Sequence, residues 1–79
     1  MQVYVAIFSH KFGEDVSVYR TSEGAEKWRI TLADDYWHDA FGMDYEKPKD
    51  EEKMAQMYWD AMRDNGEEWF SIQACQIED

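Results

Sequence analysis

The side chains of this chain that could do chemistry are two histidines, one cysteine and eighteen acidic residues. His38 lies four residues after Asp34, so on a helix the two would share a face, as an acid–base pair or as two metal ligands. No third ligand follows at a fixed spacing. His10 falls in a predicted hairpin loop and supports no mechanism by itself. The histidines therefore predict neither catalysis nor a metal site.

Cys75 and the carboxylates add no reactive site. Cys75 lies in an alternating, strand-like segment, where a cysteine is usually a small packed side chain, and a single cysteine excludes an internal disulfide. Two carboxyls act in glycosidases only when they lie in a cleft with unlike environments. Residues 60–68 also fail the spacing of a calcium-binding loop. We therefore expect a protein that is not an enzyme and binds no cofactor and no metal.

The acidic residues are distributed unevenly along the chain. Residues 1–33 carry four acids and four bases, whereas residues 34–79 carry fourteen acids and four bases, which gives the net charge of −10. This excess repels nucleic acids and anionic lipid surfaces, so we expect direct binding to neither. It favours a basic protein as the partner. The acids that we expect to bind this partner lie on two predicted helices and the linker between them: Asp34, Asp35, Asp39, Asp44, Glu46, Glu51, Glu52, Asp60 and Asp64.

Neighbouring acids at i and i+4 of a helix lie about 5–6 Å apart, which is comparable to the phosphate spacing along a nucleic-acid strand. Asp35 and Asp39 form one such pair, and Asp60 and Asp64 form another. These pairs support the hypothesis of a non-catalytic inhibitor that imitates the charge of DNA and occupies a basic groove on a nucleic-acid-binding protein. The alternative is a small structural or assembly module that acts through homo- or hetero-oligomerisation, with acidity only for solubility.

The aromatic residues, 16% of the chain, supply a core and candidate anchors for that surface. We expect the four tryptophans mainly in the core: Trp28, Trp37, Trp59 and Trp69. So many aromatic residues cannot all be buried in a domain of this size, so some should flank the acids, where aromatic side chains anchor interfaces. The candidates for that role are Tyr36, Tyr45, Tyr58 and Trp59.

Hydrophobic periodicity predicts three strands. The first strand (1–9) has no polar residue at positions 3–8, which is typical of a central strand covered on both sides. A hairpin loop with Gly13 leads into residues 15–20, which alternate as a half-buried second strand. Residues 67–77 alternate as the third strand.

Two helices separate the second strand from the third. Thr21 or Ser22 can cap the first helix, whose apolar residues recur at helical spacing until Gly42 ends it. The second helix begins near Pro48 and ends at Asn65. The element order is therefore ββααβ.

We expect one α+β domain over residues 1–79, with a three-stranded sheet and both helices packed on one face. The favoured strand order is 2-1-3, with the last strand parallel to the first if the helices form an antiparallel pair. The alternative is an all-antiparallel 1-2-3 sheet. No segment is apolar and long enough for a signal peptide or a membrane span, so we expect a soluble cytoplasmic protein. The oligomeric state stays open, with a monomer favoured.

Three segments of the N-terminal third, residues 4–6, 10–16 and 21–25, resemble the start of small acidic proteins encoded by phages and mobile elements. Their pattern is strand, H-x-x-G-x-D hairpin, strand and T-x-E-x-A helix start, which implies structural roles. The size, acidity and single-domain build also resemble anti-CRISPR proteins that imitate nucleic acids. That resemblance implies a phage-encoded protein in the host cytoplasm that blocks target-DNA binding by a Cas effector complex, and it carries over no functional residue.

Overall fold

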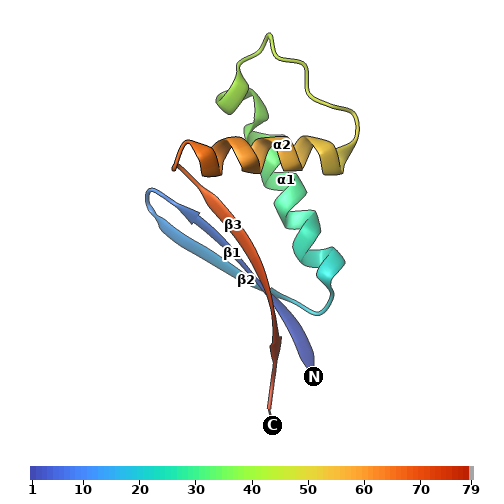
Figure 1. The fold of residues 1–79 in the computed structure, drawn as a ribbon. Coiled ribbons are helices and arrows are strands. Elements are labelled where there is room, and N and C mark those ends of the chain that lie inside the picture. Colours follow the sequence, from blue (N-terminus) through green and yellow to red (C-terminus); the bar gives the residue numbers. More distant parts are fainter. Residues whose placement is uncertain (79) are drawn as a thin grey trace.

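The computed structural model describes residues 1–78 and has the predicted element order. The elements are β1 (Gln2–His10), β2 (Gly13–Tyr19), α1 (Ser22–Phe41), α2 (Glu51–Asp64) and β3 (Trp69–Gln76). Both helices lie on the same side of the three-stranded sheet (Figure 1). The fold is elongated, with extents of 51 × 27 × 17 Å. Within residues 1–78, neither helix has the length and apolar character that crossing a membrane requires.

The sheet has the predicted strand order, β2-β1-β3, with β1 in the centre. The predicted direction of the last strand is wrong, because β3 runs antiparallel to β1. The physical reason is that α1 and α2 cross one another instead of lying as an antiparallel pair (Figure 1). The chain therefore leaves α2 at the hairpin end of the sheet, where Trp69 pairs with Ser9.

One face of the sheet packs against the helices. Phe8 of β1 is buried there, and its ring lies 5.7 Å from Trp59 of α2 and 6.5 Å from Trp28 of α1. Buried residues of both helices complete this core: Ala33, Trp37, Met54, Ala55, Tyr58 and Met62. Trp69 departs from the expectation that tryptophans lie in the core, since its side chain is 49% exposed.

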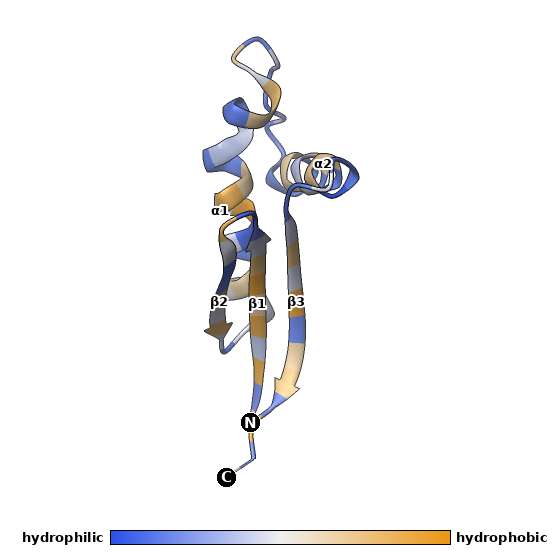
Figure 2. Ribbon diagram, turned by 90° about the vertical axis from the view of Figure 1, so that its left-hand side faces the viewer, coloured by the Kyte–Doolittle hydropathy of each residue, from blue (hydrophilic) through white to orange (hydrophobic). Residues whose placement is uncertain are grey.

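No helix or loop of residues 1–78 covers the opposite face of the sheet, which lies in front of α1 in Figure 2. We call this surface the open sheet face and define it by six residues that the strand register places side by side: Val5, Ile7, Val16, Val18, Ser71 and Gln73. Val16 and Val18 are 59% and 60% exposed. On this face of β1, Val3 is buried and Val5 and Ile7 are half-buried, but no second layer lies over them within residues 1–78. The prediction that the first strand is covered on both sides is therefore wrong for the described chain.

The β1–β2 hairpin shows what the H-x-x-G-x-D segment does. His10 Nδ1 accepts a hydrogen bond from the Phe12 amide at 3.3 Å, and His10 Nε2 lies 3.1 Å from a carboxylate oxygen of Asp15. Gly13 follows with a φ of 132°, a conformation that favours glycine. The segment closes the turn, so its histidine has a structural role.

The helix ends follow from local hydrogen bonds. Thr21 caps α1 as predicted, because its Oγ1 accepts from the Gly24 amide at 3.1 Å. Gly42 ends the helix with a φ of 83°, and its amide donates to His38 O at 2.8 Å. α2 begins at Glu51, slightly later than the predicted start near Pro48, and Asp50 caps it, since Asp50 Oδ1 accepts from the amides of Glu52 and Lys53 at 3.0 and 3.2 Å.

Candidate protein-binding surface

The C-terminal half of α1 and the loop after it project away from the sheet, beyond the point where α2 crosses α1 (Figure 1). We define residues 34–52, which also include the first residues of α2, as the acidic lobe. It carries eight acids and two lysines, so 19 residues account for −6 of the net charge of −10. Most of the nine acids predicted to bind a partner lie in this segment. The structure therefore gathers them at one end of the molecule.

An aromatic cluster holds the loop of the acidic lobe onto α1. Trp37 is fully buried, and its ring lies 4.3 Å from that of Phe41. Tyr45 stacks on Phe41 at 5.3 Å, and the Trp37 indole N–H donates to Tyr45 O at 3.2 Å. An ion pair between Lys47 and Asp34 adds a second tether between loop and helix. These contacts hold the loop that carries Asp44 and Glu46 against α1.

The nine predicted acids fall into two classes by their ion pairs. Five of them have no ion-pair partner within residues 1–78, and all five lie in the acidic lobe and are exposed: Asp35, Asp39, Asp44, Glu46 and Glu51. Their charges are therefore available to an external cation, which is what the hypothesis of a DNA-imitating surface requires.

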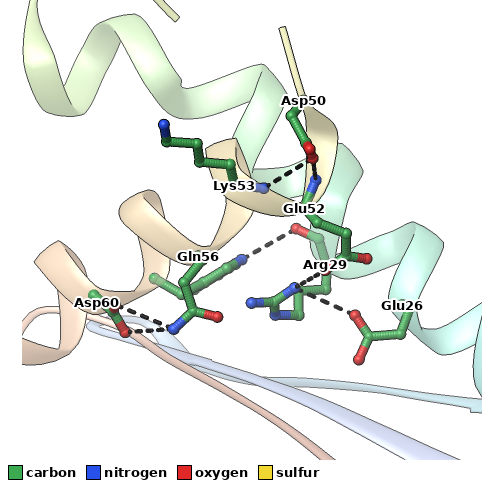
Figure 3. A network of polar contacts seen from close by, with 8 residues as sticks. Glu26, Arg29, Asp50, Glu52, Lys53, Gln56 and Asp60 are labelled. Atoms are coloured by element: carbon green, nitrogen blue, oxygen red, sulfur yellow. Dashed lines mark hydrogen bonds and ion pairs between the residues drawn. The ribbon is translucent and has the colours of Figure 1, made fainter. Parts of the chain in front are cut away.

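The other four acids have partners within the chain. Asp34 pairs with Lys47, and Glu52 lies 3.8 Å from Arg29, which also contacts Glu26 at 3.3 Å (Figure 3). Asp60 and Asp64 both contact Arg63, at 3.3 and 3.6 Å. Asp60 also accepts from the Gln56 amide at 3.1 and 3.2 Å (Figure 3). Their carboxylates are thus partly neutralised, although all four remain accessible to solvent.

A buried tyrosine links the acidic lobe to the turn between α2 and β3. The Tyr58 hydroxyl donates to Glu68 Oε2 at 3.1 Å. Burial of the ring, followed by the charge and hydrogen bond of Glu68, raises the pKa of Tyr58 above its usual value, and Asp39 contributes in the same direction. Tyr58 therefore connects the middle of α2 to Glu68 in the turn before β3, and the charge of Asp39 acts on the same hydroxyl.

A groove of about 720 Å³ lies beside Glu68, between the β1–β2 hairpin loop and the α2–β3 turn. Its walls include the aromatic rings of Phe12, Tyr36 and Trp69, together with the acids Glu67 and Glu68. Aromatic faces beside carboxylates suit a cation, and Lys11 of the chain itself lines the groove with its Nζ 5.0 Å from the centre of the Phe12 ring, which leaves Tyr36 and Trp69 for an external arginine or lysine. Sequence reasoning missed this groove, because its walls come from three separate stretches of the chain: residues 8–15, Tyr36 and residues 66–69.

The four aromatic anchors predicted from the sequence divide evenly. Tyr36 and Tyr45 are 45% and 49% exposed and flank the unpaired acids of the lobe, as expected. Tyr58 and Trp59 are buried in the core, so the prediction for these two is wrong. Both lie in the apolar arc of α2 with Met54, Ala55 and Met62, and this position in the sequence pattern indicates burial.

Within residues 1–78, the side chains of Asp34 and His38 contact other groups and not each other. Asp34 is engaged by Lys47, while His38 Nδ1 lies 3.2 Å from Gly42 O, so the two residues do not form the pair that their spacing allows. Cys75 is half-buried on β3. Within residues 1–78, no three of the side chains that bind metals lie close enough together to hold an ion.

Comparison with protein-family models, with curated proteins and with solved structures finds no match for this chain.

Proposed function

We propose that this protein is a non-catalytic inhibitor that binds a nucleic-acid-binding protein through the acidic lobe, in place of DNA. In its most concrete form it is a phage anti-CRISPR that blocks target-DNA binding by a Cas effector complex. The observation that carries the proposal is the set of five exposed acids without ion pairs on a projecting, packed lobe.

The arrangement of charge in the lobe favours a basic groove as the target. Asp35 and Asp39 are neighbours on one face of α1, at a spacing of about 5–6 Å that suits arginine and lysine side chains placed to receive phosphates. Asp44 and Glu46 add two exposed acids in the loop that follows α1. A concentrated charge of this kind accelerates encounter with a basic surface, whereas exposed aromatic anchors such as Tyr36 prolong the complex.

The test is a pull-down from a bacterial host that carries CRISPR systems, followed by a salt series on the captured protein. We expect capture at about 0.1 M NaCl and steep loss toward about 0.5 M, because screening weakens contacts between exposed charges. Capture that does not depend on salt would count against an electrostatic lobe.

Two matched variants then locate the surface. Asp35→Lys with Asp39→Lys reverses an unpaired i, i+4 pair in the lobe, and Asp60→Lys with Asp64→Lys reverses a pair of the same spacing that Arg63 partly neutralises. We expect the first variant to weaken binding about 100-fold and the second much less. Equal losses would show that general acidity, rather than the lobe, drives binding.

A further inference from the structure

The sequence of β1 predicts packed layers on both faces of the sheet, whereas the structure has such a layer on one face only. Residues 3–8 are apolar at every position, a pattern found in strands that are buried on both faces. The helices cover only one face, and beside β1 the valines Val16 and Val18 of the open sheet face are 59% and 60% exposed. This face therefore has the composition of a core surface that lacks its second layer.

The middle of the open sheet face carries no charge, and the two charged residues on the same side of β2, Glu14 and Arg20, lie at the ends of that strand. None of its six residues is charged, whereas the acidic lobe lies with the helices on the other side of the sheet. A second copy of the chain can approach by this face with its acids turned outward. The repulsion between two copies of net charge −10 then opposes the contact least.

We propose that a second copy of this chain covers the open sheet face and forms a two-fold symmetric dimer, with the two sheets packed as a sandwich about 10 Å apart. A two-fold axis perpendicular to the strands places β1 over β1 and β2 over β2, in opposite directions. Val16 and Val18 then pack on the same valines of the second copy. An axis parallel to the strands would place them on the polar Ser71 and Gln73 instead.

Two charged residues at the ends of β2 complement one another in this arrangement. Glu14 lies near the hairpin, opposite Ser9 of β1, and Arg20 follows the last residue of the strand. Both continue the alternation of Val16 and Val18, both are exposed, and neither has an ion-pair partner within residues 1–78. Because the two β2 strands run in opposite directions, Glu14 of one copy faces Arg20 of the other. The two-fold symmetry produces this contact at two equivalent places.

The same two residues cannot meet within one copy. They are six positions apart on an extended strand, a separation of about 20 Å. Any energetic coupling between them must therefore come from contact between copies. This makes the pair a specific test of the proposed axis.

The area of the face suits a reversible dimer. Three strands about 4.8 Å apart, with about eight residues each, present a footprint of about 14 by 26 Å, which corresponds to roughly 500 Å² of accessible surface per copy once side-chain relief is included. The dimer would bury about 1,000 Å² in total, near the lower limit for a specific interface. We therefore expect a dissociation constant in the micromolar range rather than a permanent dimer.

Sedimentation equilibrium over protein concentrations from about 1 μM to 1 mM tests the dimer. We expect the mass to rise from 9.5 kDa to twice that value. Val16→Lys with Val18→Lys should raise the dissociation constant at least about 100-fold, because four lysines would face one another in an apolar contact. The control, Thr31→Lys with Ala40→Lys, adds the same charge at exposed positions of α1 and should remain dimeric.

A charge exchange tests the arrangement without placing charge in the middle of the face. Glu14→Arg and Arg20→Glu should each weaken the dimer about tenfold, and the two together should restore it to within about threefold of the original chain. A wild-type chain that stays monomeric at about 1 mM overturns the proposal, as does an unchanged dimer of the double-lysine variant. A double exchange whose losses simply add overturns the proposed axis.

The dimer and the proposed function use different faces and can fail separately. Asp35→Lys with Asp39→Lys should leave the mass of the dimer unchanged while it weakens partner binding about 100-fold.

Discussion

Replacement of Trp37 by phenylalanine should destabilise the acidic lobe measurably without unfolding the protein. Trp37 is fully buried against Phe41, and its indole N–H donates to Tyr45 O at 3.2 Å. Loss of part of the ring and of this hydrogen bond should cost about 2 kcal/mol. A chain of 79 residues has a total stability of about 4–12 kcal/mol, so the variant should still fold.

The assay is thermal and urea unfolding monitored by circular dichroism, with Trp69→Phe as the control. A loss of about 2 kcal/mol lowers Tm by about 8–16 °C in a domain of this size. Trp69 is 49% exposed, so its replacement should change stability by less than about 0.5 kcal/mol. If the two variants lose the same amount of stability, the contacts of Trp37 do not hold the loop of the acidic lobe onto α1, and this account of the lobe is refuted.

Two further predictions concern α2 and its N-cap residue. Asp50→Ala should lower the free energy of unfolding by about 1 kcal/mol, measured in urea, because Asp50 Oδ1 caps the helix. Asp50→Ser should lower it much less, since serine can also cap a helix. Equal losses in the two variants would contradict the capping role. Burial and Glu68 raise the pKa of Tyr58 in the folded state, so its contribution to stability is present below about pH 10 and is lost as pH rises further. Tyr58→Phe should therefore lose less stability than the original chain between about pH 10 and pH 11.5, and parallel curves would contradict the assignment.

The sequence was sufficient for local structure because each element carries its own signals. The apolar run of β1 predicted its central position, and Gly13 and Gly42 mark a turn and a helix end where positive φ is found. The direction of β3 could not be predicted in the same way. It depends on how α1 and α2 cross, and side-chain periodicity within each helix does not determine that angle.

The candidate site was predictable as a region but not residue by residue. Charge counting located the acidic lobe, yet the ion pair of Asp34 with Lys47 spans 13 residues and the contact of Glu52 with Arg29 joins two helices. Such contacts depend on tertiary structure. The exposure of Tyr36 has a similar origin, because Tyr36 lines an open groove with Phe12 and Trp69, which are distant in the sequence.

The expectation of a first strand covered on both sides raises a different question. Its apolar pattern fits a two-layered environment, while the described chain supplies one layer. A second copy on the open sheet face would reconcile the two.

The most direct measurement of the central proposal is competition with DNA. Labelled target DNA is bound to a Cas effector complex captured in the pull-down, and fluorescence anisotropy follows its displacement by the original chain and the two double-lysine variants. We predict displacement by the original chain and by Asp60→Lys with Asp64→Lys, and about 100-fold weaker displacement by Asp35→Lys with Asp39→Lys. If the last variant displaces DNA as well as the original chain does, the acidic lobe does not occupy the DNA site.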